Sequence, residues 1–298
     1  MIDVQLPKYG PAWAGSLMGT SIASTLSGLH GLRIGQIVFA LIAAVLLVIF
    51  TVGTKNEPPR HQNMAGWGMY TMGLLACGSA WTALTGTDAF QLASWWIGAP
   101  LSVVVCLWQL WGLFKQQHHY DKPAFPWGLA LVSPMVAATS AGQLAINHGQ
   151  FYHYAGELCF FLTFITAIPL FAYCYWSLAR RQDRPREAAA GTAWIPLGVV
   201  GQSTAASTLL FNAHIYGIIM FIIGAPCVVF AMYCFYQAVV AWAPYGPGWW
   251  GSTFPVGTLC LGSWDEGWHR LSLALLVLLL LHWGASALRF GTWRFQRA

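Results

Sequence analysis

The chain has 298 residues, of which 57% are hydrophobic and only 8% are charged, and its formal net charge is +5. Soluble domains carry about 25% charged residues, so this composition excludes a soluble globular fold and predicts an integral membrane protein whose apolar surface is solvated by lipid. The positive charge does not indicate nucleic-acid binding, because the basic residues gather between apolar runs, as they do in cytoplasmic loops of membrane proteins.

Charge-free runs divide the chain into membrane spans. A spanning helix needs about 20 mostly apolar residues. Seven runs hold one span each, and the longest, 188–264, is broken by polar and proline-rich segments into three. In chain order the predicted spans are 11–29, 33–53, 63–85, 91–114, 126–147, 154–178, 190–211, 215–241, 249–263 and 269–289. We expect an all-α fold of ten transmembrane helices in a single transmembrane domain, 1–298, with no soluble domain.

The basic residues predict the orientation of these spans, because cytoplasmic loops are rich in Lys and Arg. With the N-terminus inside, twelve basic residues are cytoplasmic and only Arg33 and Arg270 lie outside. The twelve are Lys8, Lys55, Arg60, Lys115, Lys122, Arg180, Arg181, Arg184, Arg186, Arg289, Arg294 and Arg297. This bias predicts a multi-pass protein of the plasma or inner membrane with both termini in the cytoplasm.

Odd-numbered and even-numbered spans differ in composition. The second span reads IVFALIAAVLLVIF, which suits contact with lipid, whereas the first reads GSLMGTSIASTLSG and the fifth and seventh resemble it. Small residues allow close helix packing or leave open space beside the backbone. Proline occurs in or at the start of four odd-numbered spans, at Pro11, Pro126, Pro134, Pro196 and Pro255, and it also occurs in even-numbered spans, at Pro100, Pro169 and Pro226. The alternation suggests five helical hairpins, with the odd-numbered helices inside and around a central pore.

The predicted inner helices carry hydroxyls, exposed backbone at glycine and proline interruptions, but no fixed charge. A proline frees a carbonyl one turn earlier, and an interrupted helix presents partial positive charge at the start of its second half. Such a path would bind anions weakly, as conduction requires.

Motifs of enzymes are absent from the sequence. There is no HExxH, P-loop, GxGxxG or CxxC motif, and Gly201-Gln202-Ser203-Thr204-Ala205 lies in a predicted membrane helix rather than at a nucleophile elbow. A membrane haem needs paired axial ligands at matching depth, and of nine histidines only His282 is deep. We therefore expect no enzymatic activity, cofactor or metal, and we expect His282 to be hydrogen-bonded within the bundle.

Glu157 is the one acidic residue that we place inside a span, four residues after His153 and on the same helix face. A carboxylate within the membrane is a candidate functional group. Because Glu157 lies about one turn from the outer surface, an interfacial ion pair or a subunit contact is the favoured interpretation. Proton coupling through Glu157 or His282 is the alternative.

Three segments resemble the tellurite-resistance/dicarboxylate transporter family, which includes the bacterial tellurite-resistance protein, the yeast malate permease, the fungal sulfite pump and the plant slow anion channel. Segment 13–26 is similar to the family's Trp followed by Met-Gly-Thr-Gly-Ile, 194–203 to its Leu-Gly-Pro-x-Gly-Gln, and 249–257 to its Trp-Trp-x-x-Thr-Phe-Pro. The matches occur in the family's order. Ser21 stands where the family has glycine, and Val199 where many members have proline.

The resemblance implies five hairpins around a pore, a homotrimer with one pore per subunit, and Phe254 as the plug of the pore. It implies transport of small anions, which include inorganic anions, oxyanions and C4-dicarboxylates such as malate. With the small-residue pattern, it nominates as pore-lining Gly15, Gly19, Thr20, Pro134, Pro196, Gly201, Gln202, Thr253 and Pro255. Two alternatives stay open: a proton-coupled transporter on the same fold, and a haem- or quinone-binding anchor subunit of a redox enzyme.

Overall fold

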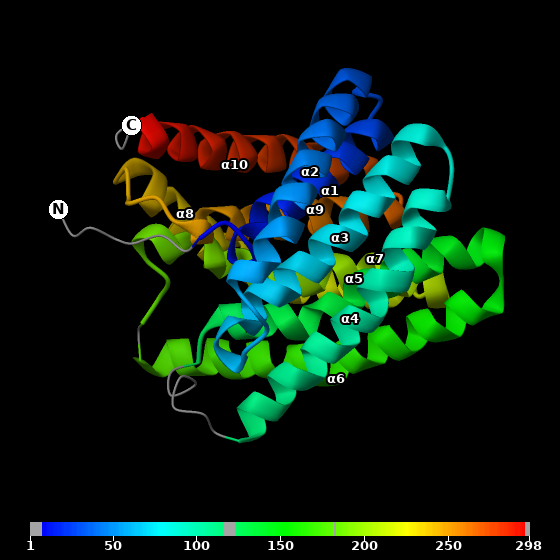
Figure 1. Ribbon diagram of the computed structural model, residues 1–298. Coiled ribbons are helices and arrows are strands. Elements are labelled where there is room, and N and C mark those ends of the chain that lie inside the picture. Colours follow the sequence, from blue (N-terminus) through cyan, green and yellow to red (C-terminus); the bar gives the residue numbers. More distant parts are fainter. Residues whose placement is uncertain (1–7, 116–122, 182, 296–298) are drawn as a thin grey trace.

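A computed structural model of the chain describes residues 8–115, 123–181 and 183–295 (Figure 1). Within these residues the protein consists of ten α-helices joined by short 3-10 turns and loops, without strands. The helices are α1 (Ala14–Leu29), α2 (Arg33–Gly53), α3 (Met64–Thr85), α4 (Ala89–Phe114), α5 (Leu129–His148), α6 (Gln150–Arg181), α7 (Ile195–Phe211), α8 (His214–Val240), α9 (Thr253–Asp265) and α10 (His269–Phe295). The all-α prediction with ten helices is confirmed, and each predicted span overlaps one helix.

α6 and α10 are longer than the predicted spans 154–178 and 269–289, whereas α7 and α9 begin later than the predicted spans 190–211 and 249–263. α6 begins at Gln150, directly after Gly149, whose φ of 91° ends α5 and reverses the chain within one residue. Lys122 and Arg297, which the sequence assigns to the cytoplasmic side, lie outside the described residues, as do His118 and His119.

Each odd-numbered helix is preceded directly by a 3-10 turn. These turns are η1 (Pro11–Trp13), η3 (His61–Asn63), η5 (Phe125–Gly128), η6 (Glu187–Trp194) and η7 (Pro247–Ser252). One proline occupies the first or second position of each of η1, η5, η7 and α7, where its missing N–H breaks no helical hydrogen bond. Of the prolines expected to interrupt odd-numbered helices, Pro134 is the one that lies beyond the first turn of an α-helix in the described chain. The others lie within the first turns.

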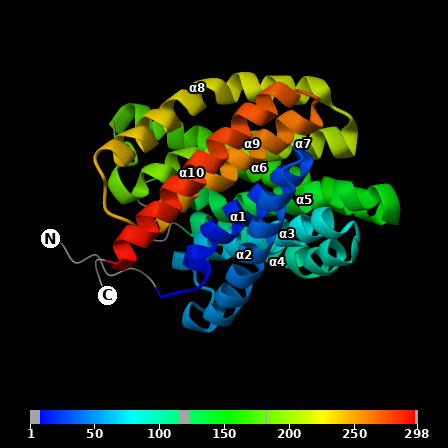
Figure 2. The same cartoon turned by 90° about the horizontal axis from the view of Figure 1, so that it is seen from above.

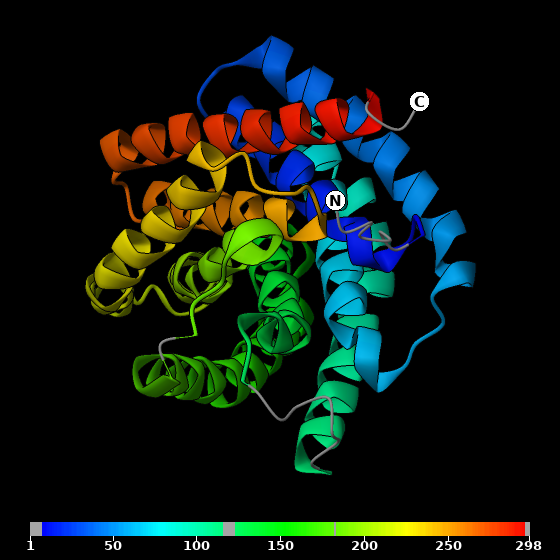
Figure 3. The same ribbon diagram turned by 90° about the vertical axis from the view of Figure 1, so that its left-hand side faces the viewer.

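The odd-numbered helices form a closed ring. Packing contacts join α1 to α3, α3 to α5, α5 to α7, α7 to α9 and α9 back to α1. Each even-numbered helix packs on the odd-numbered helix before it and lies at the periphery, as Figure 3 shows end-on. α8 lies along one edge of the bundle and α2 and α4 along the opposite edge (Figure 2). The small-residue helices are therefore inside and the bulky helices outside.

Burial follows the same division. In the most apolar 18-residue window, α5 is 83% buried, whereas α2, α4, α6, α8 and α10 are only 22–39% buried. Large exposed apolar side chains such as Ile34, Leu158 and Ile215 lie on even-numbered helices; among the described α-helical residues Ile146 is the exception. Six helices are long and apolar enough by themselves to cross a membrane: α5 and the five even-numbered ones. The peripheral helices thus present a surface that only lipid or another apolar surface can cover.

The connections gather on two opposite ends of the bundle. At one end Glu57 accepts a hydrogen bond from the Ala12 amide at 3.0 Å, and Tyr245 contacts Trp13 and Trp293, with ring centroids 6.0 and 5.8 Å apart. α1 therefore begins where α10 ends. We name this end the basic face, because most of the described basic residues lie there: Lys8, Lys55, Arg60, Lys115, Arg180, Arg184, Arg186 and Arg294.

The other end, which we name the opposite face, holds the α3–α4 connection with Asp88, and Asp265 and Glu266 at the end of α9. Asp88, in the α3–α4 connection, accepts a hydrogen bond from Asn147 at 3.0 Å and lies 3.1 Å from His148 at the end of α5. Hydrogen bonds from Asn147 and His148 hold the pKa of Asp88 below its usual range, so this carboxylate is ionised at neutral pH. Fixed charge is thus kept at the two ends of the ring.

Candidate functional site

Two small cavities lie inside the ring, and all five odd-numbered helices contribute to each, with η7 extending α9 in one of them. The polar cavity, of about 40 Å³, lies towards the C-terminal ends of these helices and is lined by Thr25, Ser79, Thr139, Ser140, Gln143 and Gln202 with apolar neighbours. The methionine cavity, of about 20 Å³, lies towards their N-terminal ends and is lined by Met18, Met69 and Met72 with Gly15, Gly198 and Trp250. The cavities follow the axis of the ring from the opposite face towards the basic face.

Phe254 is the one lining residue that the two cavities share among the described residues. It lies in the first turn of α9, and its side chain is only 3% exposed. η7 directs the chain into this turn, and Thr253 Oγ1 donates to the Trp250 carbonyl at 2.9 Å across the junction. The ring of Phe254 therefore lies where the two cavities meet.

Both cavities are lined by neutral groups. The described linings contain no charged or titratable side chain, and the polar groups are hydroxyls and carboxamides. A path without fixed charge binds an anion only through hydrogen-bond donors and backbone dipoles, which hold it weakly enough to be released.

Four of the ten residues predicted as gate or pore lining reach these cavities: Gly15, Gln202, Phe254 and Pro255. The other six residues lie at helix contacts or inside helices. Their assignment as lining residues stays a prediction.

Gly19 and Gly201 lie at tight contacts with α9. A Cβ atom at Gly19 would collide with the Thr253 side chain, and one at Gly201 would collide with the backbone of Thr258 and Leu259. Thr20 accepts a hydrogen bond from Trp283 Nε1 at 2.9 Å and is turned towards α10. Pro134 and Pro196 are buried in α5 and α7.

Several residues that line the cavities were not predicted from the sequence, chiefly Met69, Met72, Ser79, Thr139 and Gln143. Thr139 lies in the small-residue segment of α5, whose composition was recognised although its individual residues were not. Gln143 offered a further signal, because a carboxamide is costly inside an apolar helix unless it is paired or functional.

The two candidates for proton coupling lie on peripheral helices. Glu157 Oε1 and His153 Nε2 of α6 lie 3.2 Å apart, with side chains 30% and 35% exposed. His282 of α10 is buried, stacked on Phe235 and in edge contact with Trp194, with ring centroids 4.3 and 5.0 Å apart. Contrary to expectation, His282 Nδ1 makes no hydrogen bond to any described residue. Neither candidate lines a cavity of the ring.

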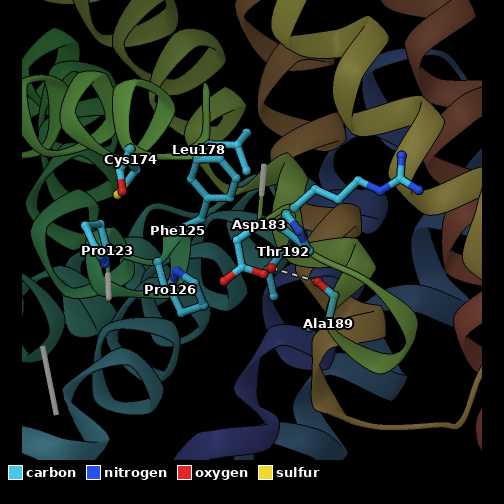
Figure 4. A pocket seen from close by; sticks show the side chains of 12 residues that line it. Pro123, Phe125, Pro126, Cys174, Leu178, Asp183, Ala189 and Thr192 are labelled. Carbon is cyan, nitrogen blue, oxygen red and sulfur yellow. Dashed lines mark hydrogen bonds between the residues drawn. The ribbon is translucent and has the colours of Figure 1, made fainter. Parts of the chain in front are cut away.

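Two larger depressions lie outside the ring. One, of about 260 Å³, opens on the basic face between the end of α6 and η5 and η6, with Phe125, Leu178, Asp183 and Thr192 around it (Figure 4). The guanidinium of Arg184, at its rim, stacks on Tyr233 at 4.8 Å. The other, of about 510 Å³, is an apolar groove between α1, α2 and α10. Neither combines all five odd-numbered helices, so we place the candidate site on the axis.

Comparison with known proteins adds independent information. The family model described as voltage-dependent anion channel matches residues 8–290. Sulfite efflux pumps of Arthroderma benhamiae and Trichophyton rubrum are each 24% identical to this chain, over 89% of its length and 83% of theirs. The sulfite efflux pump of Arthroderma otae is 23% identical over 92% of this chain and 86% of its own. The family match includes all three segments on which the resemblance was based.

Proposed function

The chain belongs to the voltage-dependent anion channel family, and on that premise we propose that it conducts small anions along the axis of the five odd-numbered helices, with Phe254 as the plug. Membership confirms the resemblance drawn from the sequence, and it makes the protein a multi-pass membrane protein of a family of anion channels and transporters rather than of enzymes. The observation that carries the proposal is the position of Phe254, shared by two cavities that are otherwise lined by different residues.

In the proposed mechanism the aromatic ring blocks the axis and conduction begins when it swings aside. The neutral linings bind an anion weakly on either side of the plug. With the basic face in the cytoplasm, an inside-negative potential drives anions outward by about 2.3 kcal/mol per charge per 100 mV. The sulfite efflux pumps among the relatives make sulfite the first substrate to test, followed by chloride, nitrate, tellurite-like oxyanions and malate.

Replacing the plug tests the proposal. Phe254→Ala should raise anion current several-fold in planar bilayers that contain the purified protein, because the methyl group of alanine leaves the two cavities joined. Phe160→Ala is the matched control, since Phe160 is equally buried (4% against 3% exposed) but packs between α6, α7 and α8. Unchanged current in Phe254→Ala, with normal assembly, would remove Phe254 from the gate.

Passive conduction is better supported than proton coupling, because neither Glu157 nor His282 reaches the proposed path. The two mechanisms differ in reversal potential. A passive path gives a reversal potential set by the anion gradient alone, whereas coupled transport shifts it when a pH gradient is imposed. A homotrimer with one path per subunit remains part of the proposal, on the ground of the family resemblance.

A further inference from the structure

We infer that the polar cavity selects singly charged oxyanions that carry a hydroxyl group, such as hydrogen sulfite or bicarbonate, through the carbonyl oxygen of Gln202. The inference rests on the proposed conduction path and adds a substrate class to it. It starts from one buried atom: Gln202 Oε1, in a side chain only 3% exposed, accepts no hydrogen bond from any described residue.

The orientation of the Gln202 carboxamide follows from its neighbour on α5. Thr139 donates its single hydroxyl hydrogen to a backbone carbonyl, either that of Met135 at 3.2 Å or that of Gln202 at 3.4 Å. The Thr139 oxygen is then left to accept, and it does so from Gln202 Nε2 at 2.8 Å. The amide nitrogen of Gln202 is thereby held on α5, and its carbonyl oxygen remains as an unpaired acceptor in a residue that lines the polar cavity.

Donors line another part of the same cavity. Gln91 Nε2 donates to Gln143 Oε1 at 2.7 Å and to Ser140 Oγ at 3.0 Å. Ser140 and Gln143 act as acceptors in these bonds, and neither the Ser140 hydroxyl nor the Gln143 amide donates to a described residue, so their hydrogens are available to a ligand. Gln143 and Ser140 both line the polar cavity.

The cavity thus offers hydrogen-bond donors and one unpaired acceptor. It fits an anion that accepts hydrogen bonds through its charged oxygens and donates one through a hydroxyl group. The anionic oxygens of a hydroxyl-bearing oxyanion take hydrogen bonds from Gln143 and Ser140, and its O–H donates to Gln202 Oε1. Chloride or nitrate has no hydrogen to offer, so a lone pair of Gln202 would face negative charge. A site whose buried acceptor pairs with a donor of the ligand discriminates against an analogue that lacks this donor, because the acceptor is then left without a hydrogen bond. The cavity volume of about 40 Å³ has room for one small anion or about three waters.

Bicarbonate and nitrate are matched probes, because both are planar, singly charged and similar in size, and only bicarbonate carries a hydroxyl hydrogen. The permeability ratio is obtained from the reversal potential with one anion on each side of a planar bilayer, at a pH where bicarbonate predominates. Phe254→Ala serves as the background, so that the path is open. In this background bicarbonate should be favoured over nitrate, and a ratio of one or less would overturn the inference.

Gln202→Leu in the same background should lower the bicarbonate-to-nitrate ratio about fivefold or more, since leucine has no acceptor. Thr139→Val, which keeps the shape but removes the hydroxyl that orients the carboxamide, should lower it by a smaller factor. Gln36→Leu is the control: Gln36 is a glutamine of α2 with the same 3% exposure, outside both cavities, and the ratio should stay unchanged.

The outcomes separate this inference from the proposal beneath it. A ratio unchanged by Gln202→Leu and by Thr139→Val, in protein that elutes as one symmetrical species in detergent, overturns the role of Gln202 and leaves conduction standing. Absence of anion current in the Phe254→Ala protein, in any anion, overturns the conduction path itself. If Gln202→Leu does not fold, Thr139→Val and the ratio in the background decide.

Discussion

At the residue scale, Gly198 and Gly201 lie about one turn apart on α7 and have different surroundings. A Cβ atom at Gly201 would overlap the backbone of Thr258 and Leu259 on α9, and backbone atoms cannot move without displacing a helix. A Cβ atom at Gly198 would meet Pro255 at 3.7 Å, which is an ordinary van der Waals contact. The absence of a side chain at Gly201 therefore sets the distance between α7 and α9.

We predict that Gly201→Ala destabilises the protein by about 1–3 kcal/mol, the usual cost of overpacking a close contact. Gly198→Ala should leave stability unchanged or raise it slightly, because alanine is the better helix former. Thermal unfolding in detergent, followed by tryptophan fluorescence, measures both. Equal midpoints for the two variants would contradict the close approach of α7 and α9.

At the element scale, the end of α8 is fastened to α10 by one buried cation. Arg289 of α10 is 8% exposed, and its guanidinium donates to the carbonyls of Trp242 and Ala243, which follow the last turn of α8. The same group stacks on the rings of Trp242 and Trp249 at 4.2 and 5.5 Å. A cation at this place pairs with the carbonyls of the segment that follows α8 and lies near the negative end of the helix dipole.

Arg289→Met should lower the melting temperature by roughly 5 °C or more, because hydrogen bonds from a charged group contribute about 1.5–3 kcal/mol and the carbonyls would be left without a donor. Arg289→Lys should restore only part of the loss, since an ammonium group lacks the planar fork. Arg294→Ala, at an exposed position one and a half turns further along α10, is the control. A melting temperature of Arg289→Met equal to that of the control would show that the contact contributes nothing.

At the scale of the whole molecule, charge and hydropathy divide the surface into two polar ends and an apolar girdle. The girdle consists of the even-numbered helices, and the described basic residues lie mainly at one end. Because a bilayer contacts the girdle, the two ends must be on opposite sides of the membrane. By the positive-inside rule, the basic face is the end that we propose to lie in the cytoplasm.

Cysteine labelling in intact cells tests this orientation. Thr87→Cys, in the exposed α3–α4 connection, should react with a membrane-impermeant maleimide, whereas Gln62→Cys, in the exposed turn before α3, should react only after permeabilisation. The unmodified protein is the control, since six of its seven cysteines are buried and Cys227 lies within α8. Labelling of Gln62→Cys alone in intact cells would reverse the assigned orientation.

The ten helices were predictable because each span is a local property of the chain. Burying backbone in lipid requires a helix, and about 20 apolar residues must supply it, so the charge-free runs locate the spans without reference to neighbours. The division into inner and outer helices could also be predicted from composition, because α1, α5 and α7 are rich in small residues and α2 in bulky ones. The proline and tryptophan residues before α1 and α9 were recognised in the sequence. The 3-10 geometry of the turns that contain them was not predicted.

The rotation of each helix about its own axis, and its depth in the bundle, could not be predicted from the sequence. Gly15 and Thr20 were both expected at the pore, yet five residues place them about 140° apart on a helix, and only Gly15 reaches a cavity. Gly201 and Gln202 are adjacent, and one meets α9 while the other meets Thr139 of α5. The sequence by itself determined which ten segments form helices, because a charge-free apolar run favours a helix by its own length and composition. Only the tertiary structure decided which side chains share a cavity, because that depends on how all five inner helices are turned against one another.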